Sequence, residues 1–224
     1  RSLQNPTTIT LSPDRRQALV AVARRIGLTI VEDDVYGFLM ERPPTTLAEI
    51  GPDVTVYVTS VSKSLFPGLR TGFIIPPEHL LDRVAAMLRA VMLTTSHLGA
   101  VTTAELIDSG EGARIVARRR AVVAERQRLA QARLGPFLTA SDRAVTHLWL
   151  PLPEPWRREA FARELLDRGI KVTPADAFTV ARGDTPHAVR VCLCSVDRED
   201  VLDGALKVVA DLLHQPVPAE SALV

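Results

Sequence analysis

The chain carries the stretch TSVSKSLFPGLRTG at residues 59–72, and this stretch decides how the rest of the sequence is interpreted. It lies between two predicted strands, Val54 to Thr59 and Gly72 to Ile75. Lys63 is flanked by serines, and Arg70 follows it in the same loop. A lysine amine can form an imine with a carbonyl, while hydroxyls and a guanidinium can bind an anion. Taken alone, a lysine in a serine-rich loop is more often a solvated side chain, so the surrounding sequence has to support this interpretation.

The preceding segment is predicted to be a helix that leads into a strand. Ser12-Pro13 has the hydroxyl cap and the proline of a helix start, and Gly27 is a typical helix end. Four apolar residues share one face of this helix: Leu19, Val22, Ala23 and Ile26. The apolar run 28–31 then predicts a buried strand that ends at Glu32-Asp33-Asp34. Strands separated by helical stretches indicate an α/β sheet.

The acidic end of this strand suggests which carbonyl compound the lysine binds. Open α/β sheets bind ligands at the carboxyl ends of their strands, which is where Asp33 stands. Pyridoxal phosphate is a carbonyl compound with a phosphate, and its chemistry needs a carboxylate beside the ring nitrogen. Asp33 suits that role, and Tyr36 can donate to the phenolic oxygen of the ring. By itself the hexapeptide 32–37 would be interpreted as an acidic loop that caps a turn.

The second part of the chain is predicted to be helical at first and then mixed. Residues 78–135 have helical character with a break near 110–112, and their basic stretch 118–128 is interpreted as a solvated helix face. After Gly135-Pro136, strands and helices alternate: strands at 147–150, 171–173 and 189–193, and helices at 157–168 and 198–213. This alternation suits a small α+β domain. The tail after His214 is expected to fray.

The composition argues against several classes of protein. The 27 basic and 26 acidic side chains nearly cancel, which argues against nucleic-acid binding by this segment. No apolar run approaches the roughly 20 residues needed to cross a bilayer, and the first residues do not form a secretory signal. We therefore expect a cytoplasmic protein without a membrane partner.

Several other residues have a structural interpretation. Cys192 and Cys194 have neither a zinc nor a redox spacing, and they are expected to be small buried apolar residues with no metal. His97 and His147 are expected to be structural histidines. The two tryptophans are expected to pack in a core or a domain interface.

The chain resembles the aminotransferase class I and II family, whose members are fold-type I proteins that depend on pyridoxal phosphate. The resemblance covers most of the chain and rests on motifs in the family's order: Asn5-Pro6-Thr7, Asp33-Asp34-Val35-Tyr36, Ser60-x-Ser62-Lys63, Pro67-Gly68-Leu69-Arg70 and Arg190-Val191-Cys192. More narrowly, three runs are similar to the aminotransferase-like domain of MocR-type regulators, a branch of the GntR transcription factors: Gln4-Asn5-Pro6-Thr7-Thr8, Arg15-Arg16-Gln17-Ala18-Leu19 and Val172-Thr173-Pro174-Ala175.

The resemblance implies a division into two domains. Residues 1–95 would be the carboxy-terminal portion of the cofactor-binding large domain, an α/β structure with a mixed, mostly parallel sheet. Residues 96–224 would be a small α+β domain that includes a long connecting helix. The first half of the family's fold is expected before Arg1, and a neighbouring subunit usually contributes, so a homodimer is implied.

The resemblance also implies roles around the cofactor ring. Lys63 would hold pyridoxal phosphate as a Schiff base and move the proton at the α-carbon of an amino acid. Asp33 would pair with the pyridine nitrogen. Asn5 and Tyr36 would bind the phenolic oxygen.

Other residues would hold anions. Ser60, Ser62 and Arg70 would bind the phosphate, and Arg190, with Asn5, would bind the α-carboxylate of the substrate. Arg190 lies in a predicted apolar strand, where an isolated charge is costly unless it is paired. Its partner is expected to be a ligand or a structural carboxylate.

Three functions remain open at this point. The domain could transfer an amino group between an amino acid and a keto acid, or it could sense a ligand for a DNA-binding domain that lies upstream of this chain. A truncated, inactive remnant is the third. After Asn5-Pro6-Thr7, Thr8 stands where simple aminotransferases usually carry glycine, which resembles the pattern of the regulator branch.

Overall fold

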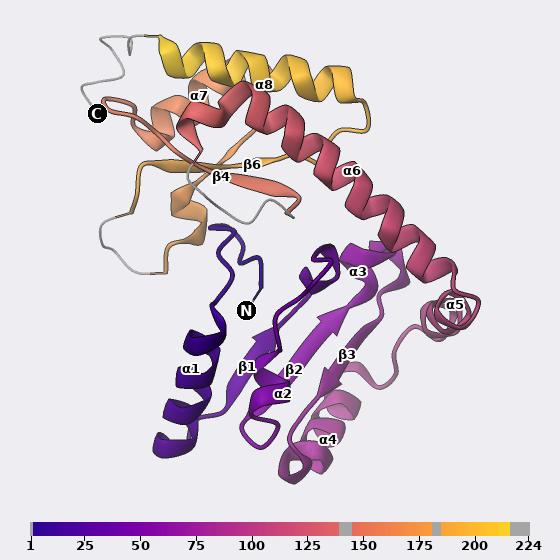
Figure 1. Ribbon diagram of the computed structural model, residues 1–224. Helices are drawn as coiled ribbons and strands as arrows, with labels where there is room; N and C mark the ends of the chain where they lie inside the picture. The colour runs from indigo at the N-terminus through magenta and orange to yellow at the C-terminus, as the bar shows by residue number, and fades with distance from the viewer. Residues whose placement is uncertain (1, 139–144, 181–184, 216–224) are drawn as a thin grey trace. The chain divides into compact units, whose positions relative to one another are not determined.

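The computed structural model describes residues 2–138, 145–180 and 185–215, which fall into two compact units (Figure 1). Of these, unit 1 comprises residues 2–3 and 10–121, and unit 2 comprises residues 4–9, 122–138, 145–180 and 185–215. The division falls within the long helix α6, Glu111–Leu134. No helix of the described ranges is long and apolar enough to cross a bilayer. The tail that was expected to fray lies, from residue 216 onward, outside the described residues.

Unit 1 is built on a three-stranded sheet in the order β1-β2-β3. Strand β1 (Ile30–Asp33) is parallel to β2 (Thr55–Ser60), and β2 is antiparallel to β3 (Gly72–Ile75). Its helices are α1 (Pro13–Ile26), α2 (Leu47–Ile50), α3 (Val61–Ser64), α4 (Leu81–Met92) and α5 (His97–Asp108), with 3-10 turns at Gly37–Leu39, Pro67–Leu69 and Glu78–Leu80. The predicted mixed α/β sheet is confirmed.

Helix α1 begins and ends as its sequence predicts, but it buries a different face. Ser12 Oγ accepts a hydrogen bond from the Arg15 N–H at 3.3 Å, and Gly27 adopts the left-handed conformation at φ 68°. The buried residues are Arg16, Val20 and Ala23, which are spaced by four and three positions. The other three members of the predicted apolar face are exposed: Leu19, Val22 and Ile26.

The prediction of a buried strand at 28–31 is wrong. Strand β1 begins two residues later, and the side chains of Leu28 and Val31 are 57% and 68% exposed. The buried residue of the strand is Glu32, at 2% exposure. Its Oε1 atom lies 3.1 Å from Nη1 of Arg16, and its Oε2 accepts the N–H of Ala48 at 3.1 Å. A buried ion pair is tolerated when its remaining polar atoms are also bonded, so Glu32 has a structural role.

Unit 2 contains an antiparallel sheet in the order β4-β6-β5 and a closed apolar core. The strands are β4 (His147–Pro151), β5 (Thr173–Pro174) and β6 (Ala188–Cys192), and the helices besides α6 are α7 (Arg158–Asp167) and α8 (Glu199–His214), with 3-10 turns at Gly135–Phe137 and Ala175–Phe178. Leu150 of β4 and Val189 of β6 contribute to the core together with Phe161 and Leu165 of α7. The strands and helices predicted here are confirmed, with ends shifted by one or two residues.

Two interpretations of residues in this unit are wrong. Cys192 and Cys194 are exposed rather than buried, because Val191 and Leu193 alternate with them and take the inward positions. The basic stretch 118–128 is not uniformly solvated. Arg126 is 6% exposed, and its guanidinium donates to the carbonyl oxygens of Leu193 at 2.8 Å and Asp197 at 3.1 Å.

One of the two histidines and one of the two tryptophans singled out in the sequence are buried, and the other of each pair is more exposed. His147 is buried, as a structural histidine would be, whereas His97 is exposed at the first turn of α5. Trp156 is buried in the core of unit 2. Trp149 is half-buried and meets the ring of Phe178 edge to face, with 6.2 Å between the ring centroids.

Candidate functional site

In unit 1 the candidate residues gather at one edge of the sheet. Strands β1 and β2 run parallel, with Asp33 beside Val58 in the register. Both strands therefore end at the same edge, where β1 ends at Asp33 and β2 ends at Ser60. Lys63 follows within the single turn of α3. The structure thus places the predicted carboxylate and the predicted lysine at the edge where open α/β sheets bind ligands.

Two buried residues anchor the turn that carries Lys63. Val61 and Leu65 are 7% and 6% exposed, and their spacing of four positions puts them on one side of the turn. The Val61 N–H donates to the Thr71 carbonyl at 3.2 Å, and the guanidinium of Arg119 donates to the Leu65 carbonyl. Lys63 itself is exposed. The backbone of the turn is fixed while the amine stays accessible.

Arg70 stands in an unusual backbone conformation. It follows the 3-10 turn Pro67–Leu69 with φ 51° and ψ 32°, in the left-handed region that favours glycine. The turn is held tightly, since a Cβ atom on Gly99 would lie only 1.9 Å from the Leu69 carbonyl oxygen. Thr71 Oγ1 also donates to that oxygen at 3.0 Å. Non-glycine residues in this region cluster at ligand sites, where the surroundings hold them in place.

The side chains in this loop are suited to an anionic carbonyl compound. Within the described ranges, none of four side chains has a hydrogen bond or an ion pair: Ser60, Ser62, Lys63 and Arg70. They offer an amine, two hydroxyls and a planar guanidinium within eleven residues of sequence. A phosphate needs donors of these kinds, and a carbonyl needs the amine. The residues present therefore fit pyridoxal phosphate.

The turn after β1 presents the carboxylate and the tyrosine. Asp33 Oδ1 accepts the Val35 N–H at 3.2 Å, and Tyr36 precedes the 3-10 turn Gly37–Leu39. Both side chains are half-buried. Sequence reasoning did not single out the next residue, Asp34, which accepts a hydrogen bond from Tyr57 at 3.0 Å.

In unit 2 the structure brings Arg190 and Asn5 together. Arg190 Nη1 donates to Asn5 Oδ1 at 3.0 Å, and Nη2 lies 3.5 Å from Thr173 Oγ1. The guanidinium carbon lies 5.0 Å from the centroid of the Phe178 ring, a cation–π distance. Arg190 Nε is buried without a hydrogen-bond partner, and no carboxylate of the described residues forms an ion pair with the guanidinium. Among the described residues, the guanidinium is therefore held by a neutral amide, a hydroxyl and an aromatic ring, without a carboxylate.

His147 connects this group to the start of the chain. It is 3% exposed, and burial, followed by the nearby charge of Arg190, lowers its pKa to about 4. Hydrogen bonds to the backbone of Pro6 and Gln4 oppose that shift of the pKa. Residues 4–9 therefore belong to unit 2, and His147 holds the segment that carries Asn5. Sequence reasoning gave His147 no such role, because its partners lie far away along the chain.

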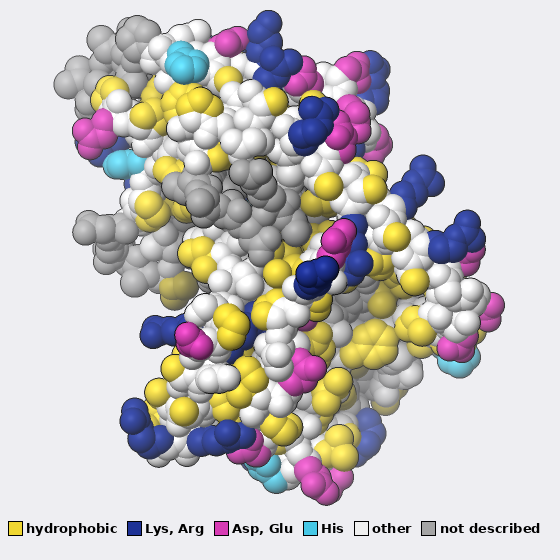
Figure 2. Space-filling model, in the orientation of Figure 1, with side chains coloured by type: hydrophobic (Ala, Val, Ile, Leu, Met, Phe, Trp, Pro, Cys, Tyr) yellow, Lys and Arg dark blue, Asp and Glu magenta, His cyan; other side chains and the backbone are white. Residues whose placement is uncertain are grey.

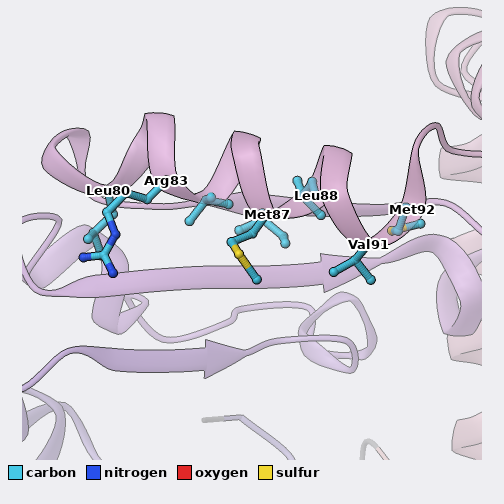
Figure 3. Close-up of a pocket in the computed structure, with 8 residues that line it drawn as sticks. Leu80, Arg83, Met87, Leu88, Val91 and Met92 are labelled. Atoms are coloured by element: carbon cyan, nitrogen blue, oxygen red, sulfur yellow. The ribbon is translucent and has the colours of Figure 1, made fainter.

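A groove of about 430 Å³ lies between β3 and α4, away from the candidate residues (Figure 3). Its lining is almost entirely apolar: Ile74, Leu80, Arg83, Val84, Met87, Leu88, Val91 and Met92. The side chains of Met87 and Val91 point from the helix toward the strand in Figure 3. The groove has no carboxylate, hydroxyl or amine, so it offers no group for acid–base or nucleophilic chemistry.

Comparison with known proteins identifies the class to which this fold and these motifs belong. The sequence profile of the family described as "Aminotransferase class I and II" matches residues 1–207, so the chain belongs to that family.

Its relatives include regulators as well as enzymes. An uncharacterized HTH-type transcriptional regulator of Bacillus subtilis, YdeF, is 27% identical over 93% of this chain and 45% of its own length. The 2-aminoadipate transaminase of Thermus thermophilus is 30% identical over 91% of this chain and 53% of its own length. The kynurenine aminotransferase of Pyrococcus horikoshii has a similar fold, with a TM-score of 0.86 at 23% identity over 95% of this chain and 54% of that one. The chain spans about half the length of these relatives.

Proposed function

We propose that this chain is the carboxy-terminal part of an aminotransferase-type domain that binds pyridoxal phosphate through Lys63 and transfers an amino group between an amino acid and a keto acid. The observation that carries this proposal is the group of unpartnered side chains around Lys63, at the edge of the sheet where Asp33 ends β1. Membership of the family supports the choice of cofactor.

The residues near the ring would have distinct tasks. Bound pyridoxal phosphate supplies an electron sink. The Asp33 carboxylate would keep its ring nitrogen protonated, and Tyr36 and Asn5 would donate to its phenolic oxygen. The Lys63 amine would hold the cofactor and move the proton at the substrate α-carbon.

The remaining residues would bind anions. Ser60, Ser62 and Arg70 would hold the phosphate through two hydroxyls and a guanidinium. Arg190 would bind the α-carboxylate of the substrate beside Asn5. Two observations support this role: Arg190 has no carboxylate partner among the described residues, and its Nε is buried without a hydrogen bond, which is costly for a polar atom.

The oligomeric state, the location and the domain bounds are also part of the proposal. We expect a homodimer in the cytoplasm, with the cofactor-binding large domain ending near residue 95 and the small domain following it. DNA would be bound only through a domain upstream of this chain.

A second function, sensing rather than catalysis, is favoured by one observation. YdeF, an uncharacterized HTH-type transcriptional regulator, is similar to this chain over 93% of the chain. In that case the same residues would bind the cofactor and an amino acid, but turnover would be slow or absent.

The assignment of Lys63 can be tested by chemical trapping in the full-length protein. The chain has two other lysines, Lys171 and Lys207, and all three are exposed. Reduction with borohydride in the presence of pyridoxal phosphate should add a pyridoxyl group to the peptide that contains Lys63. The visible absorption band should be absent in Lys63→Ala and unchanged in the matched control Lys207→Ala. A band that persists in Lys63→Ala, or a label on another lysine, would overturn the assignment.

Catalysis and sensing are separated by a second measurement. The protein loaded with pyridoxal phosphate is incubated with each of the common amino acids, and the keto acid is quantified. Formation of a keto acid that requires Lys63 supports the aminotransferase. Binding of an amino acid, seen as a change in the visible band, without any keto acid supports the sensor.

A further inference from the structure

Asp34, the residue after the proposed partner of the ring nitrogen, is tied to the neighbouring strand at three points. Its N–H donates to the Val58 carbonyl at 2.9 Å, and its carbonyl accepts the Thr59 hydroxyl at 3.3 Å. Its side-chain Oδ2 accepts the hydroxyl of Tyr57 at 3.0 Å. Three consecutive residues of β2 therefore hold one residue of the turn that carries Asp33.

The other oxygen of this carboxyl group, Oδ1, is buried and has no hydrogen-bond partner in the described part of the chain. An ionised oxygen in that position is more costly than a neutral one. Burial raises the pKa of Asp34, as does the charge of Glu32, while the Tyr57 hydrogen bond and the charge of Arg16 oppose the rise. Burial also raises the pKa of Tyr57 to about 12, so this hydroxyl keeps its proton and remains a donor at neutral pH.

Gly37 closes the turn directly over the same carboxyl group. A Cβ atom on Gly37 would lie 2.3 Å from Asp34 Oδ2 and 2.7 Å from its Cγ. The Gly37 N–H donates to the Asp34 carbonyl at 3.3 Å, and Gly37 is buried. A larger residue could not be accommodated unless the carboxyl group left its contact with Tyr57. Residues 34–37 thus form a tight turn packed around one side chain.

We propose that Asp34 is a positioning residue, and that its hydrogen bond with Tyr57, rather than a negative charge, fixes the turn that presents Asp33 and Tyr36 to the cofactor. This inference rests on the proposed function. It assigns different tasks to two adjacent aspartates: Asp33 supplies the charge beside the ring nitrogen, and Asp34 supplies the geometry.

The test compares variants of the full-length protein in their binding of pyridoxal phosphate. Tyr57→Phe removes the donor and should weaken binding about fivefold, the loss expected for one neutral hydrogen bond. Asp34→Asn keeps an oxygen acceptor without a charge and should stay within about twofold of the wild type. Asp34→Ala and Gly37→Ala both disturb the contact and should resemble Tyr57→Phe or be worse. Asp53→Asn, in an exposed ion pair with Arg24, is the matched surface control.

A second readout separates positioning from simple loss of folded protein. The pH midpoint of the visible band does not depend on how much protein is folded, whereas its amplitude does. Tyr57→Phe should move this midpoint by roughly half a unit, and Asp34→Asn should leave it in place. A purely structural role would lower the amplitude alone.

Specific results would overturn the inference. An unchanged affinity and midpoint in Tyr57→Phe would do so, and so would an Asp34→Asn variant as impaired as Asp34→Ala, because the charge would then be what matters. If the wild type shows no band at all, the proposed function fails and this inference fails with it. A wild-type band that depends on Lys63 but not on Tyr57 overturns this inference alone.

Discussion

The two units differ in what fills their interiors. Unit 2 has an apolar core in which Phe161 and Leu165 are fully buried. In unit 1 the largest fully buried side chain is that of Arg16, paired with Glu32. Many apolar side chains of unit 1 are exposed: Val31, Phe66, Phe73, Ile74, Ile75, Leu81, Met87, Val91, Met92 and Leu93. Figure 2 shows hydrophobic side chains scattered over the face that it draws of this unit. Unit 2 thus has one continuous apolar core, whereas unit 1, which carries Lys63, combines a buried ion pair with fewer buried apolar residues, such as Val20 and Leu47.

Each unit has its own spectroscopic reporter, so this comparison can be tested directly. The two tryptophans, Trp149 and Trp156, lie in unit 2. The two tyrosines, Tyr36 and Tyr57, lie in unit 1. Tryptophan fluorescence therefore follows unfolding of unit 2, and tyrosine absorbance follows unfolding of unit 1.

The largest effect is expected from Phe161→Ala in the core of unit 2. Phe161 is 0% exposed and meets Trp156 edge to face at 5.2 Å between ring centroids. Its truncation should lower the free energy of unfolding by about 3–5 kcal/mol, since the transfer free energy is lost and a cavity remains. The measurement is the urea midpoint detected by tryptophan. A loss below about 1 kcal/mol would show that the core of unit 2 is not packed as the structure indicates.

A slightly smaller loss is expected when the buried ion pair of unit 1 is broken. Arg16→Met leaves the Glu32 carboxylate buried without its cation, which should lower the free energy of unfolding by about 3 kcal/mol. This is the lower end of the usual range, because Glu32 Oε2 keeps the Ala48 N–H. The transition detected by tyrosine should move. The double variant Arg16→Met with Glu32→Leu should recover much of the loss, and no recovery would mean that the pair is not the cause.

The sequence could predict the local features of both units. The caps of α1 at Ser12 and Gly27 and the bounds of β3 at Gly72–Ile75 were predicted, because each depends on residues close together in the chain. The buried face of α1 was not, since Arg16 is drawn inward by Glu32 from a different element. Arg126 is a similar case, because its acceptor at Leu193 is 67 positions away.

The same reasoning applies to the candidate site. Lys63 and Arg70 lie in one loop, so their motif could be read directly from the sequence. Asn5 and Arg190 are 185 positions apart, and only the family resemblance suggested that they act together. Phe178, Thr173 and Tyr57 were missed, because their contacts with site residues arise from sheet register and turn packing.

One titratable group in each unit should make the free energy of unfolding depend on pH, and the two groups act in opposite directions. The pKa of His147 is lowered to about 4 in unit 2, so between pH 6.5 and about 4 the unfolded state binds more protons and the stability falls as the pH falls. From pH 7 to pH 5 this group should remove at most about 2 kcal/mol. In unit 1 the raised pKa of Asp34 has the opposite sign, and its contribution is lost as the pH rises.

This response can be isolated by difference. The free energy of unfolding, detected by tryptophan fluorescence, is measured as a function of pH in the wild type and in His147→Gln. Exposed carboxylates contribute equally in both proteins, so the difference between the two pH slopes reports His147 alone. The wild type should show the steeper loss below pH 6.5. Equal slopes would mean that His147 is solvated and does not hold residues 4–6.

The smallest effect concerns two valines on helices of different units. Val209 of α8 is 1% exposed, whereas Val91 of α4 is 75% exposed. Val209→Ala should lower the free energy of unfolding by about 2 kcal/mol, because a buried valine is truncated. Val91→Ala should be neutral or slightly stabilising, since alanine is favoured over valine in a helix by a few tenths of a kcal/mol. The tyrosine-detected midpoint tests this for Val91. A loss above about 1 kcal/mol would mean that another polypeptide surface buries this face of α4 in solution, and the exposed apolar surface of unit 1 would then be an interface.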